Sequence, residues 1–401
     1  MNQTSGGSGA PLVVGLDAGG TRTRAVLAAA ADGRLLGEGA AGPGNALTVP
    51  LPQLIDHLAD AVARAVPESA RGRVVAVAGG FAGATGADED DPGRLNALTA
   101  LTAALGQVGI TATALAVSSD IEAAFASAPG TPADGLALVA GTGAVAMRIT
   151  GRRCTATVDG DGWLLGDDGS GFWIGREAVR AALRMADGRG PATLLAGSVG
   201  QALGLPAEVL PYADGSEAYG ATGAPGGGGA DDNGGRGGPG DGPARRGGDP
   251  GAPGAGPVRP HDDPGALPPL PRPPYDGRAA LDWPRAHREA YRMHLLPVVM
   301  AEPPTRLARF APLVAEAALD KDSVAEAILD GAVDRLTDTV TALDPRPGEP
   351  VVATGGLLGP EGPLTAPLTA RLRTLGLTLD WVADGCRGAV ALARIDYGDT
   401  A

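Results

Sequence analysis

The segment Val14–Thr23 places groups that can bind phosphate at the end of a buried strand. An apolar strand is predicted to end at the carboxylate of Asp17, and the chain then passes Gly19, Gly20 and the hydroxyl of Thr21 before a second strand begins. Glycines let backbone N–H groups approach an anion, and a carboxylate can hold hydrated Mg²⁺. The spacing matches neither G-x-G-x-x-G nor G-x-x-x-x-G-K-[ST]. We interpret the segment as a phosphate-binding hairpin; an ordinary glycine-rich hairpin is the alternative.

Two further glycine turns follow predicted strands. Gly141-Thr142-Gly143 lies between strands at 136–140 and 144–149, and Gly355-Gly356 follows a strand at 351–354. Two strand–turn–strand units suggest two related domains with a cleft between them. Two of the turns can cradle phosphates through their N–H groups, and the third can approach a nucleoside closely.

Asp120 is the candidate general base. Phosphoryl transfer needs a group that accepts the proton of the attacking hydroxyl. Asp120 follows a predicted strand at 114–117 and stands where a helix begins. An aspartate in that position is also a common helix N-cap. The local sequence leaves both interpretations open.

The segment Asp159–Trp173 combines carboxylates, glycines and two tryptophans. Such a mixture suits a sugar, which needs hydrogen bonds to its hydroxyls and an apolar surface for its ring. A solvated acidic loop is the alternative, and the pair Asp167-Asp168 could instead cap a helix predicted to start at Ser170.

Composition restricts the class of protein. The chain has 401 residues, 46 acidic against 32 basic, and a net charge of −14, which argues against binding to nucleic acid or anionic membranes. Its two cysteines, Cys154 and Cys386, form no C-x-x-C motif. We find no signal peptide and no apolar run of the ~18–20 residues that a membrane span needs. The expected location is therefore the cytoplasm.

The order of elements indicates an α/β protein. In the 28 residues 223–250, 13 are glycine and 4 are proline, so we interpret 212–275 as a disordered low-complexity insertion. The other predicted strands are 12–16, 24–29, 35–39 and 74–78, and the predicted helices are 51–66, 94–108, 170–183, 284–300, 307–319, 323–343 and 386–395.

These features together resemble a known family. The chain resembles the N-acetylglucosamine kinase branch of the BadF/BadG/BcrA/BcrD ATPase family, within the actin, hexokinase and heat-shock chaperone ATPase superfamily. The resemblance is carried by the following segments: Gly15–Thr23, Gly42–Asn45, Asp120, Ala140–Gly143, Leu164–Trp173, Gly355-Gly356 and Asp384–Ala389.

The resemblance implies two ribonuclease-H-like domains that close on ATP and an amino sugar, plus the insertion. The implied domains are 11–128 and 129–385, the latter interrupted by 212–275, with 386–401 as a helix that returns to the domain junction. ATP, Mg²⁺, a small-molecule amino sugar and a homodimer are the implied cofactors and partners. The implied roles are a catalytic base at Asp120, Mg²⁺ binding at Asp17, ATP binding at Gly19, Gly20, Thr21, Arg22, Thr23, Gly141, Thr142, Gly143, Gly355 and Gly356, and sugar binding at Asn45, Asp120, Gly160, Asp161, Gly162 and Asp167.

The sequence departs from the family pattern within the sugar loop. Asp161 stands between Gly160 and Gly162, where family members usually carry tryptophan, and Asp168 replaces a usual glutamate. An acid at 161 would weaken packing against an N-acetyl group or favour a free amine. The expected activity is phosphorylation of the 6-hydroxyl of an amino sugar, with N-acetylglucosamine first. The alternatives are a non-catalytic sugar and ATP sensor, and an ATPase activator of a radical dehydratase, which would need closely spaced cysteines to bridge an iron–sulfur cluster.

Overall fold

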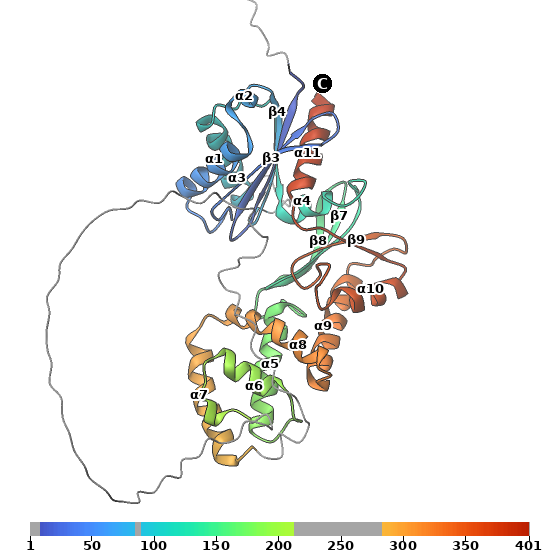
Figure 1. The fold of residues 1–401 in the computed structure, drawn as a ribbon. Helices are drawn as coiled ribbons and strands as arrows, with labels where there is room; N and C mark the ends of the chain where they lie inside the picture. The colour runs from blue at the N-terminus through green and yellow to red at the C-terminus, as the bar shows by residue number, and fades with distance from the viewer. Residues whose placement is uncertain (1–8, 85–89, 212–282, 401) are drawn as a thin grey trace, which may run out of the picture. The chain divides into compact units, whose positions relative to one another are not determined.

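Two five-stranded mixed sheets organise the protein, and they share one topology (Figure 1). The computed structural model describes residues 9–84, 90–211 and 283–400. The strand orders are β3-β2-β1-β4-β5 and β8-β7-β6-β9-β10. In each sheet the first three strands form an antiparallel meander, and the last two run parallel to the first strand. The repeated order is that of the ribonuclease-H-like, actin and hexokinase-type fold, so the predicted fold class is confirmed.

Along the chain, helices connect the strands of each sheet and follow its last strand. The first sheet and its helices comprise β1 (Leu12–Ala18), β2 (Thr23–Ala29), β3 (Leu35–Ala41), α1 (Leu51–Ala65), α2 (Glu68–Arg71), β4 (Val74–Phe81), α3 (Pro92–Gln107), β5 (Ala114–Ser119) and α4 (Asp120–Ala126). The second comprises β6 (Gly135–Ala140), β7 (Ala144–Thr150), β8 (Arg153–Asp159), α5 (Gly171–Ala186), α6 (Leu195–Ala202), α7 (Arg285–Ala301), α8 (Ala311–Leu319), α9 (Ser323–Thr341), β9 (Pro350–Thr354), α10 (Thr365–Thr374), β10 (Thr378–Trp381) and α11 (Cys386–Thr400), with two 3₁₀ helices, η1 (Ala207–Val209) and η2 (Pro304–Phe310).

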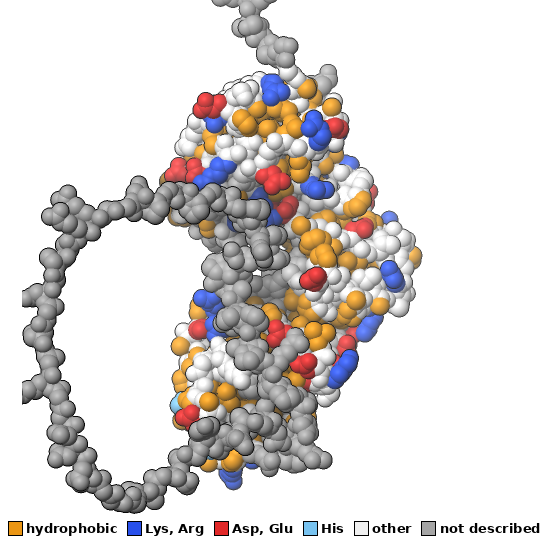
Figure 2. Space-filling view, viewed as in Figure 1, with side chains coloured by type: hydrophobic (Ala, Val, Ile, Leu, Met, Phe, Trp, Pro, Cys, Tyr) orange, Lys and Arg blue, Asp and Glu red, His pale blue; other side chains and the backbone are white. Residues whose placement is uncertain are grey.

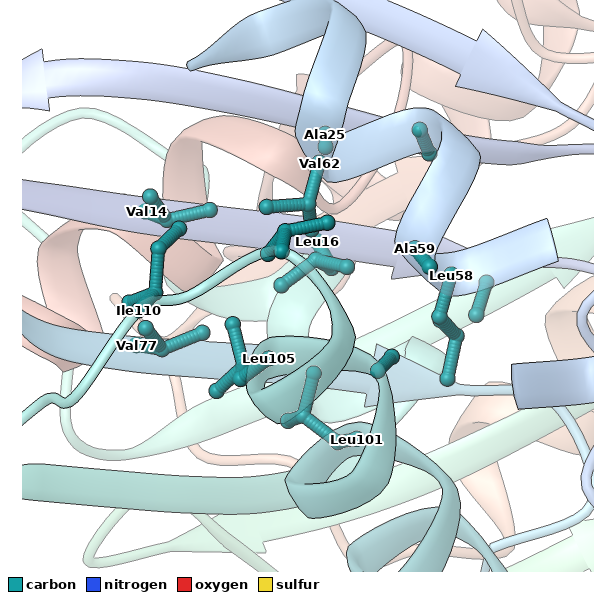
Figure 3. Close-up of a cluster of buried hydrophobic side chains, with 14 of the residues drawn as sticks. Val14, Leu16, Ala25, Leu58, Ala59, Val62, Val77, Leu101, Leu105 and Ile110 are labelled. Atoms are coloured by element: carbon teal, nitrogen blue, oxygen red, sulfur yellow. The ribbon is translucent and has the colours of Figure 1, made fainter. Parts of the chain in front are cut away.

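The main core lies between the first sheet and helices α1 and α3. Val14 and Leu16 of β1 belong to one buried cluster with Leu58 and Val62 of α1 and Leu101 of α3, and Figure 3 shows Leu16 next to Val62. All five side chains are fully buried. Burying each of these side chains contributes about 1.5–3 kcal/mol to the free energy of folding. Aliphatic side chains can therefore stabilise this core although the sequence has few aromatic residues. This packing holds the carboxyl ends of β1, β4 and β5 in place.

The helices that follow β5 and β10 pack on the opposite sheets. Helix α4 buries Ala124 and Phe125 against Ala137 and Val352 of the second sheet. Helix α11 buries Val390, among others, against the first sheet, alongside which it lies in Figure 1. Each sheet is therefore covered in part by a helix that directly follows the last strand of the other sheet.

Several elements differ from the sequence-based predictions. Strands β8 and β10 and helices α2, α6 and α10 were not predicted, because they are short or lack a clear apolar period. The predicted helix at 307–319 begins as the 3₁₀ helix η2. The insertion at 212–275 lies outside the described residues. The division into domains at residues 128 and 385 stays a prediction.

Charged side chains of both signs are interspersed over the face shown in Figure 2, and they do not gather there into one basic patch. Within the described ranges, no helix is both long enough and apolar enough to span a membrane.

Candidate active site

Asp17 and Asp120 lie at the same edge of the first sheet. Asp17 is paired with Gly80 of β4, and Gly80 is paired with Ser118 near the end of β5. Parallel strands bring their carboxyl ends to one edge, so the two carboxylates meet there although they are far apart in the sequence. A Cβ on Gly80 would lie 3.2 Å from the Cα of Asp120, so a side chain at position 80 would crowd this edge.

Asp120 is the first residue of α4, but it is not the helix cap. The hydroxyl of Ser119 accepts the N–H of Glu122, and the Glu122 carboxylate accepts the N–H of Ser119, which makes a complete capping box. The N-cap interpretation of Asp120 is therefore wrong. Its Oδ1 accepts the N–H of Ile121 at 3.0 Å. Burial, reinforced by the charge of Asp17, raises the pKa of Asp120 to about 6.

The surroundings of Asp17 suit a cation bound through oxygen. Burial and the nearby Asp384 carboxylate raise the pKa of Asp17, while the Gly385 N–H and Arg24 oppose this change. Asp17, Asp384 and Cys386 each place one potential ligand atom within 4.8 Å of the others. Mg²⁺ prefers oxygen, and burial raises the pKa of the Cys386 thiol, so the two carboxylates fit the ion and the thiol does not.

Asp384 also ties the start of α11 to the first sheet. Its Oδ2 lies 2.5 Å from Nη1 of Arg24 in β2, and its backbone oxygen accepts the Ser127 hydroxyl at 2.9 Å. The Ser127 oxygen in turn accepts the N–H of Gly388 at 2.7 Å. Sequence reasoning did not identify Arg24, because only the tertiary structure places it beside a residue 360 positions away.

The predicted phosphate hairpin is an open turn between β1 and β2. The Gly19 N–H donates to the Arg22 oxygen at 3.0 Å, and the segment from Gly20 to Arg22 is exposed. A Cβ at Gly20 would meet nothing within 4 Å, so space for a ligand exists beside this backbone. Thr23 differs from its neighbours because it is fully buried and its hydroxyl has no hydrogen-bond partner among the described residues.

Asn45 lies beside this hairpin. The N–H of the preceding Gly44 donates to the Gly19 oxygen at 2.8 Å, which brings the loop against the turn. The Asn45 side-chain oxygen accepts the N–H groups of Leu47 and Thr48 at 2.9 and 3.0 Å. These bonds hold the Asn45 side chain in one orientation within its loop.

The second glycine turn contacts both Asp167 and the start of α5. Asp167 Oδ1 accepts the Ala144 N–H at 3.0 Å, and a Cβ on Gly143 would lie 2.5 Å from that same oxygen. The Gly171 N–H donates to the Gly141 oxygen at 2.8 Å. Burial, together with other carboxylates of the loop, raises the pKa of Asp167. Ser170, rather than Asp167 or Asp168, caps α5.

The third glycine turn packs on the second. Gly355 has φ +104°, and a Cβ there would clash with the backbone oxygen of Ala140, the residue before Gly141. The Leu357 N–H donates to that same oxygen at 3.2 Å. The neighbouring β6 and β9 therefore bring two of the three predicted nucleotide turns together.

Asp159 organises the predicted sugar loop, and sequence reasoning did not assign it a role. Its carboxylate accepts the N–H groups of Gly160, Asp167 and Asp168 at 2.7, 2.6 and 2.9 Å. Asp159 itself adopts φ +65°. The signal available in the sequence was an aspartate followed directly by glycine, because strand β8 itself was not predicted. Asp161 in this loop is exposed.

The two sheets define a ribonuclease-H-like, actin and hexokinase-type fold, and comparison with known proteins identifies the family of the chain. The model of the BadF/BadG/BcrA/BcrD ATPase family matches residues 14–367. The chain therefore belongs to the BadF/BadG/BcrA/BcrD ATPase family, as its sequence predicted.

Solved structures resemble this chain along nearly its whole length. A protein from Chromobacterium violaceum assigned as an N-acetylglucosamine kinase is 19% identical with a TM-score of 0.55, covering 96% of this chain and 99% of that one. A protein from Porphyromonas gingivalis with the same assignment is 18% identical with a TM-score of 0.56, over 96% and 99% of the two chains. At these identities the likeness establishes the fold.

A curated relative matches a shorter part. The N-acetylmuramic acid/N-acetylglucosamine kinase of Clostridium acetobutylicum is 36% identical over 66 residues. The match spans 16% of this chain and 22% of the length of that protein.

Proposed function

We propose that the protein is an ATP-dependent sugar kinase that phosphorylates the 6-hydroxyl of an amino sugar, with N-acetylglucosamine as the first candidate. One observation carries the proposal: a partly buried carboxylate, Asp120, stands beside the cation-compatible Asp17 at a sheet edge and is not the N-cap of its helix. Family membership and the names of the relatives described above support the same reaction class.

Asp120 is the group that accepts the proton of the attacking sugar hydroxyl. A base works best when its pKa lies near the working pH, since it must be ionised and still basic. With a pKa of about 6, Asp120 is ionised near neutrality and more basic than an ordinary aspartate. Its Oδ1 bond to the Ile121 N–H orients the carboxylate before the sugar arrives.

The glycine turns are proposed to bind the nucleotide. The backbone N–H groups of the exposed residues Gly20–Arg22 and Thr142, with the hydroxyls of Thr21 and Thr142, offer donors to phosphate oxygens. Gly355-Gly356 would lie against the nucleoside. Mg²⁺ bound with ATP at Asp17 would neutralise charge on the phosphates.

The loop from Asp159 to Asp167, with Asn45, is proposed to bind the sugar. Asp159 fixes the loop backbone, so the Asp167 carboxylate has a defined position from which to accept sugar hydroxyls. Asp161 is exposed beside these groups and adds negative charge. An ammonium group on the sugar would therefore be tolerated better here than beside an apolar side chain.

ADP release with Mg-ATP should be measured against N-acetylglucosamine, glucosamine, N-acetylmuramic acid, N-acetylmannosamine and glucose. We expect one amino sugar to stimulate turnover strongly, and phosphorus NMR of the product should place the phosphate on the 6-oxygen. Equal ADP release with and without every sugar would refute the kinase. Sugar binding without ADP release would indicate a sensor.

A further inference from the structure

Helix α4 carries a second carboxylate that the proposed reaction does not use. The side chain of Glu122 is fully buried, with 0% of its surface exposed. An ionised carboxylate in such a place is costly unless hydrogen bonds satisfy both of its oxygens. Glu122 lies two residues after Asp120, in the first turn of the helix.

The two oxygens of Glu122 bind backbone groups of different sheets. Oε2 accepts the N–H of Ser119, the last residue of β5, at 3.0 Å. Oε1 accepts the N–H of Cys154 in β8 at 2.9 Å. Arg153 Nη1 lies 3.8 Å from Oε2 and supplies a partly exposed positive charge. One carboxylate therefore joins the residue before Asp120 to an edge strand of the second sheet.

Strand β8 is adapted to this contact. Its pairing with β7 shifts between Arg148 and Ile149, where Ile149 faces Cys154 and Arg148 faces Ala156, so that Thr155 is an extra residue. Such a bulge redirects backbone groups at a sheet edge. The same strand ends at Asp159, which organises the proposed sugar loop. The strand that receives Glu122 thus leads directly to that loop.

We propose that Glu122 is a positioning residue, which fixes Asp120 relative to the strand that leads into the sugar loop by bridging Ser119 and Cys154. This inference rests on the proposed function. The N–H groups of Ser119 and Cys154 both donate to this one carboxylate. Loss of the bridge frees the start of α4 from β8, and small displacements of a reacting group cost large factors in rate.

Glu122→Gln is the first test, since glutamine has the same shape but only one acceptor oxygen and so must place an NH₂ group against one of the two N–H donors. We expect kcat with the best sugar to fall about 10- to 100-fold while KM for ATP stays unchanged. In an Asp120→Asn background the same change should cost no further rate, because Glu122 acts through Asp120. A full additional loss in that background would overturn the proposal.

Asp322→Asn is the matched control. Asp322 is another buried carboxylate that accepts backbone N–H groups, those of Leu194, Val324 and Ala325, but it caps α9 away from Asp120. The Asp322→Asn substitution should lower the melting temperature and leave kcat unchanged. If Glu122→Gln behaves in the same way, Glu122 is merely structural and the proposal is wrong.

Should Glu122→Gln fail to fold, Cys154→Ala serves as a control that loses the thiol contacts but keeps the N–H. Cys154→Pro then keeps the glutamate and also removes the N–H donor, at a sheet-edge position, where proline is tolerated. The folded variant should show the same loss of kcat; unchanged kcat would overturn the proposal. Failure of the proposed function is separately visible, because wild-type protein would then show no sugar-dependent ADP release and Asp120→Asn would change nothing.

Discussion

Replacing Asp120 by asparagine should destroy activity and stabilise the protein at neutral and alkaline pH. The folded protein holds the pKa of Asp120 at about 6, against an ordinary value of 3.8. A raised carboxyl pKa means that folding favours the protonated form. The stability it contributes is therefore complete below pH 3.8 and is lost as the pH rises through about 6.

The difference between these two pKa values corresponds to about 3 kcal/mol, an upper figure because solvent reaches part of the carboxyl group. Asparagine keeps an oxygen that can accept the Ile121 N–H but carries no charge. The free energy of unfolding of Asp120→Asn should equal that of wild type at about pH 4. At about pH 8 it should exceed the wild-type value by up to about 3 kcal/mol.

Urea unfolding of both proteins across this pH range, without Mg²⁺ or nucleotide, measures the difference directly. Asp60→Asn, at an exposed carboxylate on α1, is the control and should change stability little at any pH. In parallel, kcat of Asp120→Asn should fall about 10²–10⁴-fold, the usual contribution of a general base. A stability difference that does not vary with pH, or a less stable variant at high pH, would refute the assigned environment of Asp120.

Three further predictions concern the turns, the sugar loop and the metal. Gly355→Ala should weaken nucleotide binding, measured by calorimetry, and lower the melting temperature, because its Cβ would clash with Ala140 at φ +104°; equal binding would contradict the nucleotide role. Asp161→Asn should lower kcat/KM for glucosamine relative to N-acetylglucosamine, and an unchanged ratio would remove Asp161 from specificity. Chelation with EDTA should abolish ADP release, and added Mg²⁺ should restore it; activity that persists would exclude the Mg²⁺ role of Asp17.

The local features of the site could be predicted from the sequence. The conformation of each glycine turn depends on residues that are neighbours along the chain. At Gly355, for example, the backbone adopts a positive φ, which glycine reaches at little cost in free energy. The apolar strands before Asp17 and Gly141 likewise follow from short-range patterning. Family membership followed from the order of such local motifs and is confirmed.

The role of Asp120 could not be predicted fully from its neighbours. Aspartate and serine are both good N-caps, but Ser119 and Glu122 have the spacing of a capping box, a local signal that sequence reasoning did not use. The decision came from Glu122, whose buried carboxylate completes a capping box with Ser119 and simultaneously binds Cys154 of a strand that the sequence did not predict.

The sequence by itself determined where the chain turns, which strands are buried and which family the protein belongs to, because these depend on contacts between near neighbours. The tertiary structure alone decided that Asp17 lies beside Asp384, that Arg24 pairs with that same residue, and that α4 and α11 pack on the opposite sheets. The physical reason is that burial and charge act through space, so their effect on a side chain depends on partners that lie far away in the sequence, as Asp384 does from Arg24.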